Sequence, residues 1–239
     1  MDKLLQTATR LLADKRISVL IILIAIAARA IQLLFYLDSF FDTTFQVIAT
    51  QNLVEGHGIS TAMVNPENLS GTIYQPLVNW PPGYSLLLSP FYMASGQNYH
   101  IACFIVDLLA ATAVILLCRK ILKTLDASLP VINLFTLFTA FFIYYFYYTG
   151  STDSISIAFF LAALSASLTS IKTNQKWTAM AVMSGGFLLL SAGLKYLFFP
   201  VVFTIPVFFF IYGWQNRLPG AKKAAFIMLA ILATGIAAL

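Results

Sequence analysis

The sequence has few charged residues for its length. Of its 239 residues, 10% are charged and 60% are hydrophobic, with a mean hydropathy of +0.86. A soluble domain has roughly a quarter charged residues, so this composition excludes an ordinary soluble domain. Long apolar runs separated by short polar stretches predict an all-α polytopic membrane protein, a bundle of transmembrane helices.

Cysteine and histidine are also scarce, and the few present do not support a disulfide or a metal site. Cys103 and Cys118 lie in one predicted helix, about 22 Å apart at the helical rise, which is too far for a disulfide. His57 and His100 have no partner at metal-ligand spacing, so neither a metal site nor a divalent metal cofactor is supported. The net charge of +5 is spread along the flanks of apolar segments, and we therefore expect no nucleic-acid partner.

Seven apolar segments are predicted to cross the membrane. They run approximately over residues 17–37, 99–118, 131–149, 154–171, 177–194, 196–213 and 224–239. The last is short and has no polar tail, so we expect the chain to be truncated at its C-terminus. Residues 1–16 place leucines at helical spacing opposite basic residues, which predicts a helix lying on the cytoplasmic membrane surface.

The distribution of basic residues predicts the orientation of these spans. Most of the 14 Lys and Arg lie in the N-terminal segment and after the second, fourth and sixth spans, and such connections stay in the cytoplasm. The loop over residues 38–98 contains no Lys or Arg. We therefore expect this loop, the connection at 150–153 and the turn at Lys195 to face outward.

The outer loop is predicted to contain two helices that lie along the membrane surface. Residues 44–55 have apolar side chains near helical spacing and end at a glycine, Gly56, a common helix stop. Residues 56–79 are rich in turn-forming residues. The Trp-Pro-Pro-Gly sequence at 80–83 then introduces an apolar stretch, residues 84–93, that is too short to cross.

Arg29 is a basic residue inside the first span. A charge inside the membrane is costly unless an anionic group meets it. Asp107, in the second span, is predicted to lie at about the same depth. Arg29 therefore either forms a structural ion pair with Asp107 or binds the phosphate of a lipid.

Four charged residues, Asp38, Asp42, Asp153 and Lys195, are predicted to lie on the outer side. Asp42 and Asp153 each lie at the start of a predicted helix and could be N-caps, Asp38 could be a solvated acid, and Lys195 could extend to lipid headgroups. Alternatively, the acids and the lysine share one cavity, where the lysine binds a lipid-linked phosphate and a carboxylate accepts a proton from an acceptor hydroxyl. That arrangement predicts a glycosyl-transfer site.

Several segments resemble the GT-C superfamily of membrane glycosyltransferases, particularly its protein O-mannosyltransferase and lipid A aminoarabinose transferase branches. The resemblance extends over most of the chain and implies a GT-C-like transmembrane domain over residues 17–239. Its anchors are Arg29, the run from Asp42 to Gly58, Trp80-Pro81-Pro82-Gly83-Tyr84, the turn from Gly150 to Asp153, and Gly193-Leu194-Lys195.

The resemblance implies transfer of a sugar, with inversion, from a polyprenyl-phosphate donor to a lipid, glycan or protein acceptor. The protein would lie among membrane lipids, in a bacterial inner (plasma) membrane, with its active site facing the periplasm or exterior. Asp42 matches the first-loop Asp that serves as general base in similar proteins, although Thr43 stands where many members have Glu. Lys195 matches a position near the lipid phosphate in similar proteins, and Arg29 could assist it in stabilising the leaving phosphate. The other candidate substrate contacts are Asp153, Asp38, His57, Trp80 and Tyr84.

Two other classes of protein also fit the sequence. A lipid or solute transporter often has helices broken near the membrane midplane, and Pro200 and Pro206 interrupt the sixth predicted span. A non-catalytic membrane subunit would use its outer acids only as helix caps and its ion pairs only as structural contacts.

Overall fold

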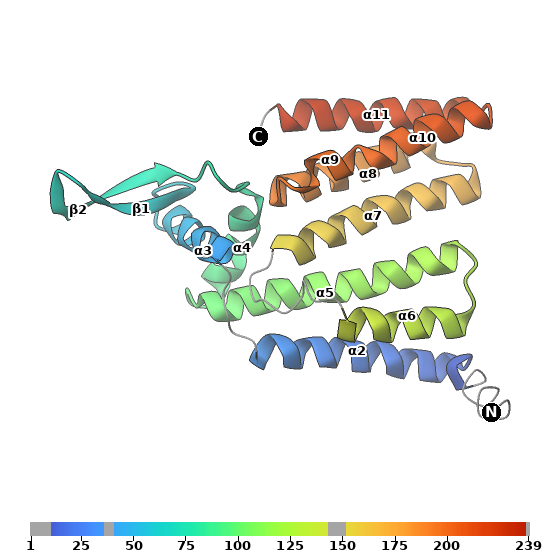
Figure 1. Ribbon diagram of the computed structural model, residues 1–239, viewed down its shortest axis with the longest axis horizontal. Coiled ribbons are helices and arrows are strands. Elements are labelled where there is room, and N and C mark those ends of the chain that lie inside the picture. Colours follow the sequence, from blue (N-terminus) through green and yellow to red (C-terminus); the bar gives the residue numbers. More distant parts are fainter. Residues whose placement is uncertain (1–10, 36–40, 143–151, 238–239) are drawn as a thin grey trace.

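The structure is a computed structural model that describes residues 11–35, 41–142 and 152–237. The helices of the described part lie side by side as a bundle (Figure 1). Its long helices are α2 (Lys15–Phe35), α5 (Tyr99–Thr124), α7 (Thr152–Thr173), α8 (Trp177–Leu194) and α11 (Pro219–Ile236). Shorter helices of the bundle are α6 (Leu129–Phe142), α9 (Phe198–Val202) and α10 (Thr204–Gln215).

Six segments of the described part are long and apolar enough to cross a membrane: α2, α5, α7, α8, α9 together with α10, and α11. The prediction of an integral membrane protein built as an apolar helical bundle is therefore confirmed. The third of the seven predicted spans, residues 131–149, corresponds to α6, a shorter apolar helix. Residues 143–149 lie outside the described residues, so a membrane crossing by this third predicted span stays a prediction.

The sixth predicted span consists of two helices, with the break between α9 and α10 at Phe203. Pro206, in the first turn of α10, has no N–H to donate to the preceding turn, and its ring crowds the carbonyl four residues earlier. The interruption indicated by the prolines is therefore present, close to the end of the bundle where α9 begins (Figure 1).

The long loop between α2 and α5 contains two helices and a β-hairpin. The helices are α3 (Phe41–Val54) and α4 (Gly83–Ala94), close to the two expected loop helices. The segment expected to be turn-rich instead forms β1 (Ser60–Asn65) and β2 (Asn68–Pro76), which pair antiparallel. The predicted all-α class holds for the bundle, and this small two-stranded sheet is the one addition to it among the described residues.

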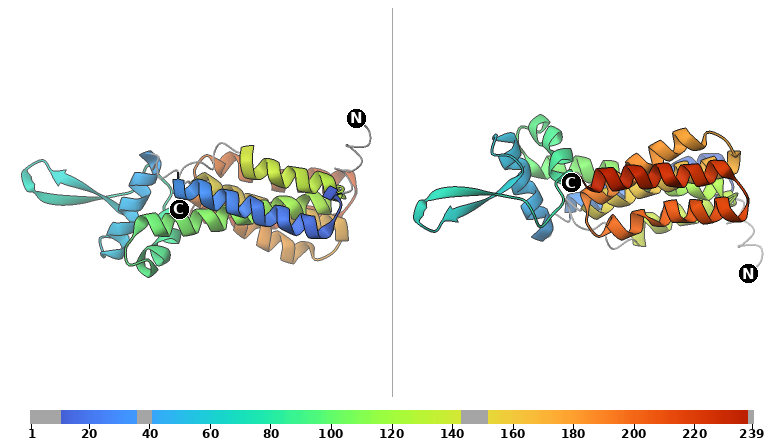
Figure 2. Two further views of the ribbon diagram at one scale, coloured as in Figure 1. Left: turned by 90° about the horizontal axis from the view of Figure 1, so that it is seen from below. Right: turned by 90° about the horizontal axis from the view of Figure 1, so that it is seen from above.

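Residues on both sides of an asparagine-proline turn explain the hairpin. Thr61 and Val64 in β1, and Thr72 in β2, are β-branched residues that favour strands. The side chain of Asn65 accepts a hydrogen bond from the backbone N–H of Glu67 at 2.9 Å, an arrangement that stabilises a tight turn. The hairpin projects away from the bundle in every view (Figures 1 and 2).

The two ends of the bundle differ in charge. We call the end that carries α3, the hairpin and α4 the loop end, and the opposite end, where α2, α6, α8 and α11 begin, the basic end (Figures 1 and 2). Ten of the twelve described Lys and Arg belong to the helix ends and turns of the basic end. They are Lys15, Arg16, Arg119, Lys120, Lys123, Lys172, Lys176, Arg217, Lys222 and Lys223.

Small side chains line the contact between α7 and α8. The hydroxyl oxygens of Ser167 and Ser184 lie 3.1 Å apart, and Ser184 also donates to the carbonyl of Ala163 at 3.2 Å. Small residues let two helices approach closely, and hydroxyl groups hydrogen-bond across the contact. This packing sets the register of α7 against α8. The two helices together position the ion pair of Asp153 and Lys195.

Candidate functional site

Asp153 and Lys195 form an ion pair at the loop end. Asp153 lies in the first turn of α7, and Lys195 directly follows the last residue of α8. A carboxylate near a helix N-terminus and an ammonium at a helix C-terminus are each favoured by the helix dipole. Both side chains keep 25% of their surface exposed, so the pair is reachable from outside the protein.

A buried serine fixes α7 and α8 next to this pair. Ser191 Oγ donates to the carbonyl of Ser156 at 2.8 Å, and both serines are fully buried. Ser156 lies one helical turn after Asp153, and Ser191 one turn before Lys195. This hydrogen bond therefore holds the backbone of both charged residues in register.

The turn before α4 rests directly on the end of α8. A Cβ atom built on Gly83 would lie 2.4 Å from the carbonyl oxygen of Gly193, a separation that atoms cannot adopt without a backbone shift. Gly83 belongs to the Trp-Pro-Pro-Gly-Tyr sequence and Gly193 to the Gly-Leu-Lys sequence. Two motifs more than a hundred positions apart are thus in backbone contact.

Helix α3 is attached to the same turn through Gln46. This fully buried side chain donates from Nε2 to the carbonyl of Pro81 at 3.1 Å and accepts from Ser85 Oγ at 2.7 Å. Its neighbour Phe45 stacks on Trp80, with ring centroids 4.4 Å apart. These contacts set the rotation of α3 about its axis. They join the predicted first loop helix to the Trp-Pro-Pro-Gly turn.

Asp42 lies in the first turn of α3 and is half-buried. Residues four positions apart share one face of a helix, so Asp42 lies on the same face as Gln46, the residue that binds the turn at Pro81. In the described part of the chain Asp42 has no ion pair with Lys195. The two residues are instead connected through the turn at residues 80–83.

Tyr84 has a packing position inside the protein. Its side chain is fully buried among residues of α4 and α5, and its hydroxyl lies 3.8 Å from Cys103 Sγ. Burial, and next the neighbouring Asp107 carboxylate, raise the pKa of Tyr84 well above its ordinary value. Tyr84 therefore anchors α4 on α5 behind the site, and any contact with a substrate stays a prediction.

His57 is placed beside the hairpin. Its ring stacks on Tyr74 of β2 at a centroid distance of 3.9 Å, and both residues are exposed. His57 also donates its backbone N–H to the carbonyl of Asn52 at 2.8 Å, which joins the end of α3 to the hairpin. The structure thus connects His57 to the hairpin, and its predicted substrate contact is untested.

Arg29 lies inside the bundle with only 2% of its surface exposed. It donates to the carbonyl of Thr139 in α6 at 3.0 Å and to Gln32 at 2.8 Å. These contacts give Arg29 a structural position between α2 and α6. Both of its predicted roles, pairing with the buried Asp107 and binding a lipid phosphate, stay predictions.

Some predicted features lie outside the described residues. These are Asp38, most of the N-terminal surface helix at residues 1–16, and the first part of the turn from Gly150 to Asp153. Within the described ranges no group of three or more His, Cys, Asp or Glu is arranged to hold a metal ion.

Sequence reasoning missed the residues that hold the site together. Gln46 and Ser85 were not singled out, and neither was the pair formed by Ser156 and Ser191. One signal was available, since Gln46 lies one turn after Asp42 on the same face of the helix. The two serines carry no signal in the sequence, because nothing distinguishes them from the other serines of these helices, such as Ser154, Ser165 and Ser184.

Comparison with known proteins gives no family assignment. No family model matches the chain, and no curated protein matches it. These comparisons therefore do not indicate a function for the chain.

Proposed function

We propose that this protein is a membrane glycosyltransferase of the GT-C type. It transfers a sugar from a polyprenyl-phosphate donor to the hydroxyl of a lipid, glycan or protein acceptor at the loop end. The observation that carries the proposal is the meeting of three segments distant in sequence. The Gly83–Gly193 contact and the Asp153–Lys195 pair join the first loop to the ends of α7 and α8.

The charge asymmetry of the bundle supports the proposed orientation. Lys and Arg accumulate in the connections that remain in the cytoplasm, so the basic end is the cytoplasmic end in this proposal. The loop end then faces the periplasm or the exterior. In this proposal the protein lies in a bacterial inner (plasma) membrane and takes its lipid-linked sugar on that outer side. Asp42, Asp153 and Lys195 would act there.

Asp42 and Lys195 each have one role in the proposed reaction, and Asp153 holds Lys195 in place. The acceptor oxygen forms a bond to the anomeric carbon while the bond from that carbon to the phosphate oxygen breaks. The acceptor proton passes to the Asp42 carboxylate, and the polyprenyl phosphate leaves with the bonding electron pair. Lys195 donates hydrogen bonds to the departing phosphate, because an ammonium has three N–H donors and Asp153 needs only one of them.

The direct test is sugar transfer by the Asp42→Asn variant. Membranes containing the protein are incubated with labelled polyprenyl-phosphate sugars and membrane extract, and the labelled product is identified. We expect the rate of sugar transfer to fall about a hundredfold or more, which is the range that a general base contributes. Glu55→Gln is the matched control, because Glu55 is an exposed acid just after α3, and it should keep normal activity. Full activity of a folded Asp42→Asn protein would exclude Asp42 as the base.

A lipid or solute transporter is the second candidate. The break at Phe203 between α9 and α10 favours it, because transporters bind substrates at broken helices. However, α9 has only five residues and α10 has twelve. The break is therefore displaced from the midplane toward the loop end, whereas transporter sites lie near the midplane. Flux into sealed vesicles without any sugar transfer would favour the transporter. Absence of both activities would favour a non-catalytic subunit.

A further inference from the structure

A basic pocket lies at the basic end, opposite the proposed catalytic site. It has a volume of about 550 Å³ and lies between α2, α5 and α6. Pockets of this size are typical of small-molecule sites. Its lining consists of four basic residues and four small or apolar ones: Lys15, Arg119, Lys120, Lys123, Ser18, Ala127, Leu129 and Ile132.

Arg119 is held in a fixed orientation at this pocket. Its guanidinium donates to Asn133 Oδ1 at 2.9 Å, to Thr136 Oγ1 at 2.6 Å and to Ser18 Oγ at 2.5 Å. All three acceptors are buried. A guanidinium has five N–H donors. The described residues accept three hydrogen bonds from Arg119, which leaves two N–H groups for a ligand. An anion in the pocket would meet a preoriented charge.

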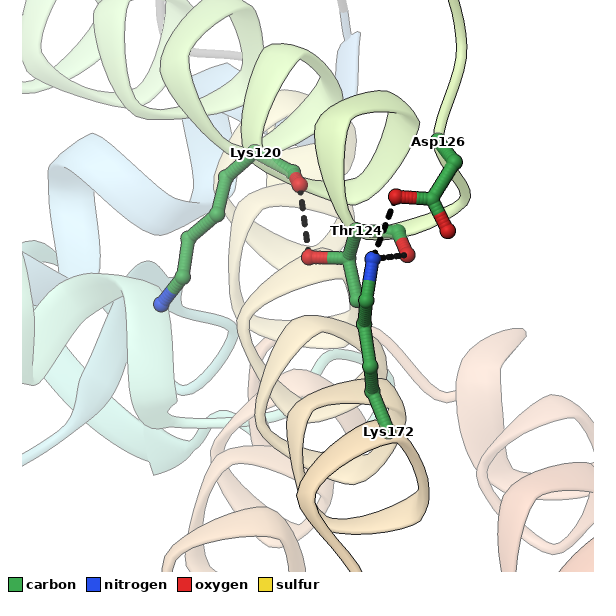
Figure 3. Close-up of polar contacts among 4 residues, drawn as sticks. All are labelled: Lys120, Thr124, Asp126 and Lys172. Carbon is green, nitrogen blue, oxygen red and sulfur yellow. Dashed lines mark hydrogen bonds and ion pairs between the residues drawn. The ribbon is translucent and has the colours of Figure 1, made fainter.

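The neighbouring acids are engaged elsewhere. Asp126 accepts a hydrogen bond from Lys172 Nζ at 2.5 Å, and the same nitrogen donates to the carbonyl of Thr124 (Figure 3). In that view the side chain of Lys120 extends away from Asp126. Asp14 accepts from the backbone N–H of Arg16 at 2.7 Å. Of the described acids, these are the two at the basic end, and neither lines the pocket.

Two helix N-termini add to the positive potential. Lys15 and Ser18 lie in the first turn of α2, and Leu129 and Ile132 lie in the first turn of α6. A helix N-terminus carries roughly half a positive charge and favours anions. The pocket therefore combines four basic side chains with two favourable helix dipoles.

We infer that this pocket binds the phosphate of an anionic lipid headgroup. Basic pockets between transmembrane helices at the cytoplasmic side are suited to such headgroups. The pocket also has apolar lining residues, and exposed apolar residues follow directly along α2 at Val19, Leu20 and Leu23. They offer a surface for acyl chains, which a soluble phosphate does not need. The inference rests on the proposed orientation, in which the basic end faces the cytoplasm, and not on the proposed sugar transfer.

The test compares lipid binding by two charge-matched double variants. Lys120→Gln with Lys123→Gln removes two exposed lysines of the pocket, and Lys176→Gln with Lys223→Gln removes two exposed lysines of the basic end outside it. Native mass spectrometry of the full chain in detergent measures bound phosphatidylglycerol, with phosphatidylcholine as the neutral lipid and inorganic phosphate as the soluble competitor. Thermal unfolding checks that both variants are folded.

We expect saturable binding of phosphatidylglycerol in preference to phosphatidylcholine. Loss of each pocket lysine lowers the affinity for phosphatidylglycerol about fivefold, so the pocket variant binds this lipid roughly thirtyfold more weakly. The affinity of the control variant changes less than about twofold. Equal affinities in both variants, or equal losses, would overturn the assignment of the pocket. Displacement of the lipid by an equal concentration of inorganic phosphate would assign the site to a soluble anion and overturn the lipid.

Discussion

At the scale of single residues, the Asp153–Lys195 pair is expected to contribute little to stability. Both side chains are one quarter exposed, and ion pairs near solvent stabilise a protein by about 1 kcal/mol or less. A lysine at the non-basic end of the bundle also departs from the charge distribution of the rest of the described chain. In the proposed function, the donor phosphate would be a second anionic partner of this lysine beside Asp153.

Substitution of Lys195 should separate a functional role from a structural one. We expect Lys195→Gln to lower kcat/KM for the polyprenyl-phosphate donor about tenfold to a hundredfold, because a hydrogen bond to a charged group contributes about 1.5–3 kcal/mol. Lys195→Arg, which keeps the charge, should retain more activity. Initial rates at varied donor concentration measure both.

The double variant Lys195→Gln with Asp153→Asn is the control for this prediction. If the pair only stabilised the helices, the neutral pair would restore activity and thermal stability together. We expect stability to be kept and activity to stay low, because the group that binds phosphate is still missing.

At the scale of elements, the contact of α4 with α8 requires glycine. The nearest atoms to a Cβ at Gly83 are backbone atoms of Gly193, which cannot rotate away as a side chain can. In contrast, a Cβ at Gly186, in the middle of α8, would meet nothing within 4 Å. The same substitution should therefore have opposite consequences at these two glycines.

We expect Gly83→Ala to destabilise the protein by about 1–3 kcal/mol, the usual cost of overpacking, and to reduce sugar transfer by displacing the loop from Lys195. Gly186→Ala should leave activity unchanged and raise the stability slightly, by up to about 1 kcal/mol, since alanine favours a helix over glycine. Thermal unfolding in detergent, together with the transfer assay, measures both variants. Equal behaviour of the two would mean that the close approach of Gly83 to Gly193 is unimportant.

The hydrogen bonds of Gln46 also belong to this scale. One buried side chain joins α3 to the turn at Pro81 and to Ser85 in α4. Because the groups left behind by its removal would be buried without their partner, their desolvation costs about 1–3 kcal/mol. The position of Asp42 thus depends on contacts between elements, since Gln46 lies one turn later on the same helix.

At the scale of the whole molecule, the separation of charge between the two ends predicts the orientation in the membrane. Cysteine accessibility can test it, since Ser70 in the hairpin and Ser128 before α6 are both exposed and lie at opposite ends. In intact cells we expect a membrane-impermeant maleimide to label Ser70→Cys but not Ser128→Cys. Permeabilised cells should show labelling of both.

The unsubstituted protein is the control for this labelling, because Cys103 is buried and Cys118 is half-buried. Labelling of Ser128→Cys alone in intact cells would place the loop end in the cytoplasm. That result would remove the proposed sugar-transfer site from the side where the acceptor is expected.

The sequence by itself determined the class of the protein and the approximate place of its helices. Apolar runs, proline and glycine are local signals, so α7 and α8 lie close to their predicted ranges, and the loop helices α3 and α4 do as well. The hairpin at residues 60–76 was missed, since its short strands are exposed and have no buried face to produce a clear alternation.

Only the tertiary structure decided which of the candidate residues meet. It joined Asp153 to Lys195 and Gly83 to Gly193, while it connected His57 to the hairpin and buried Tyr84 behind the site. Such choices depend on helix rotation and on backbone approach, which buried groups such as Gln46 and Ser191 set through contacts between distant segments. A local pattern contains no information on those contacts, because apolar helices can pack against one another in many registers.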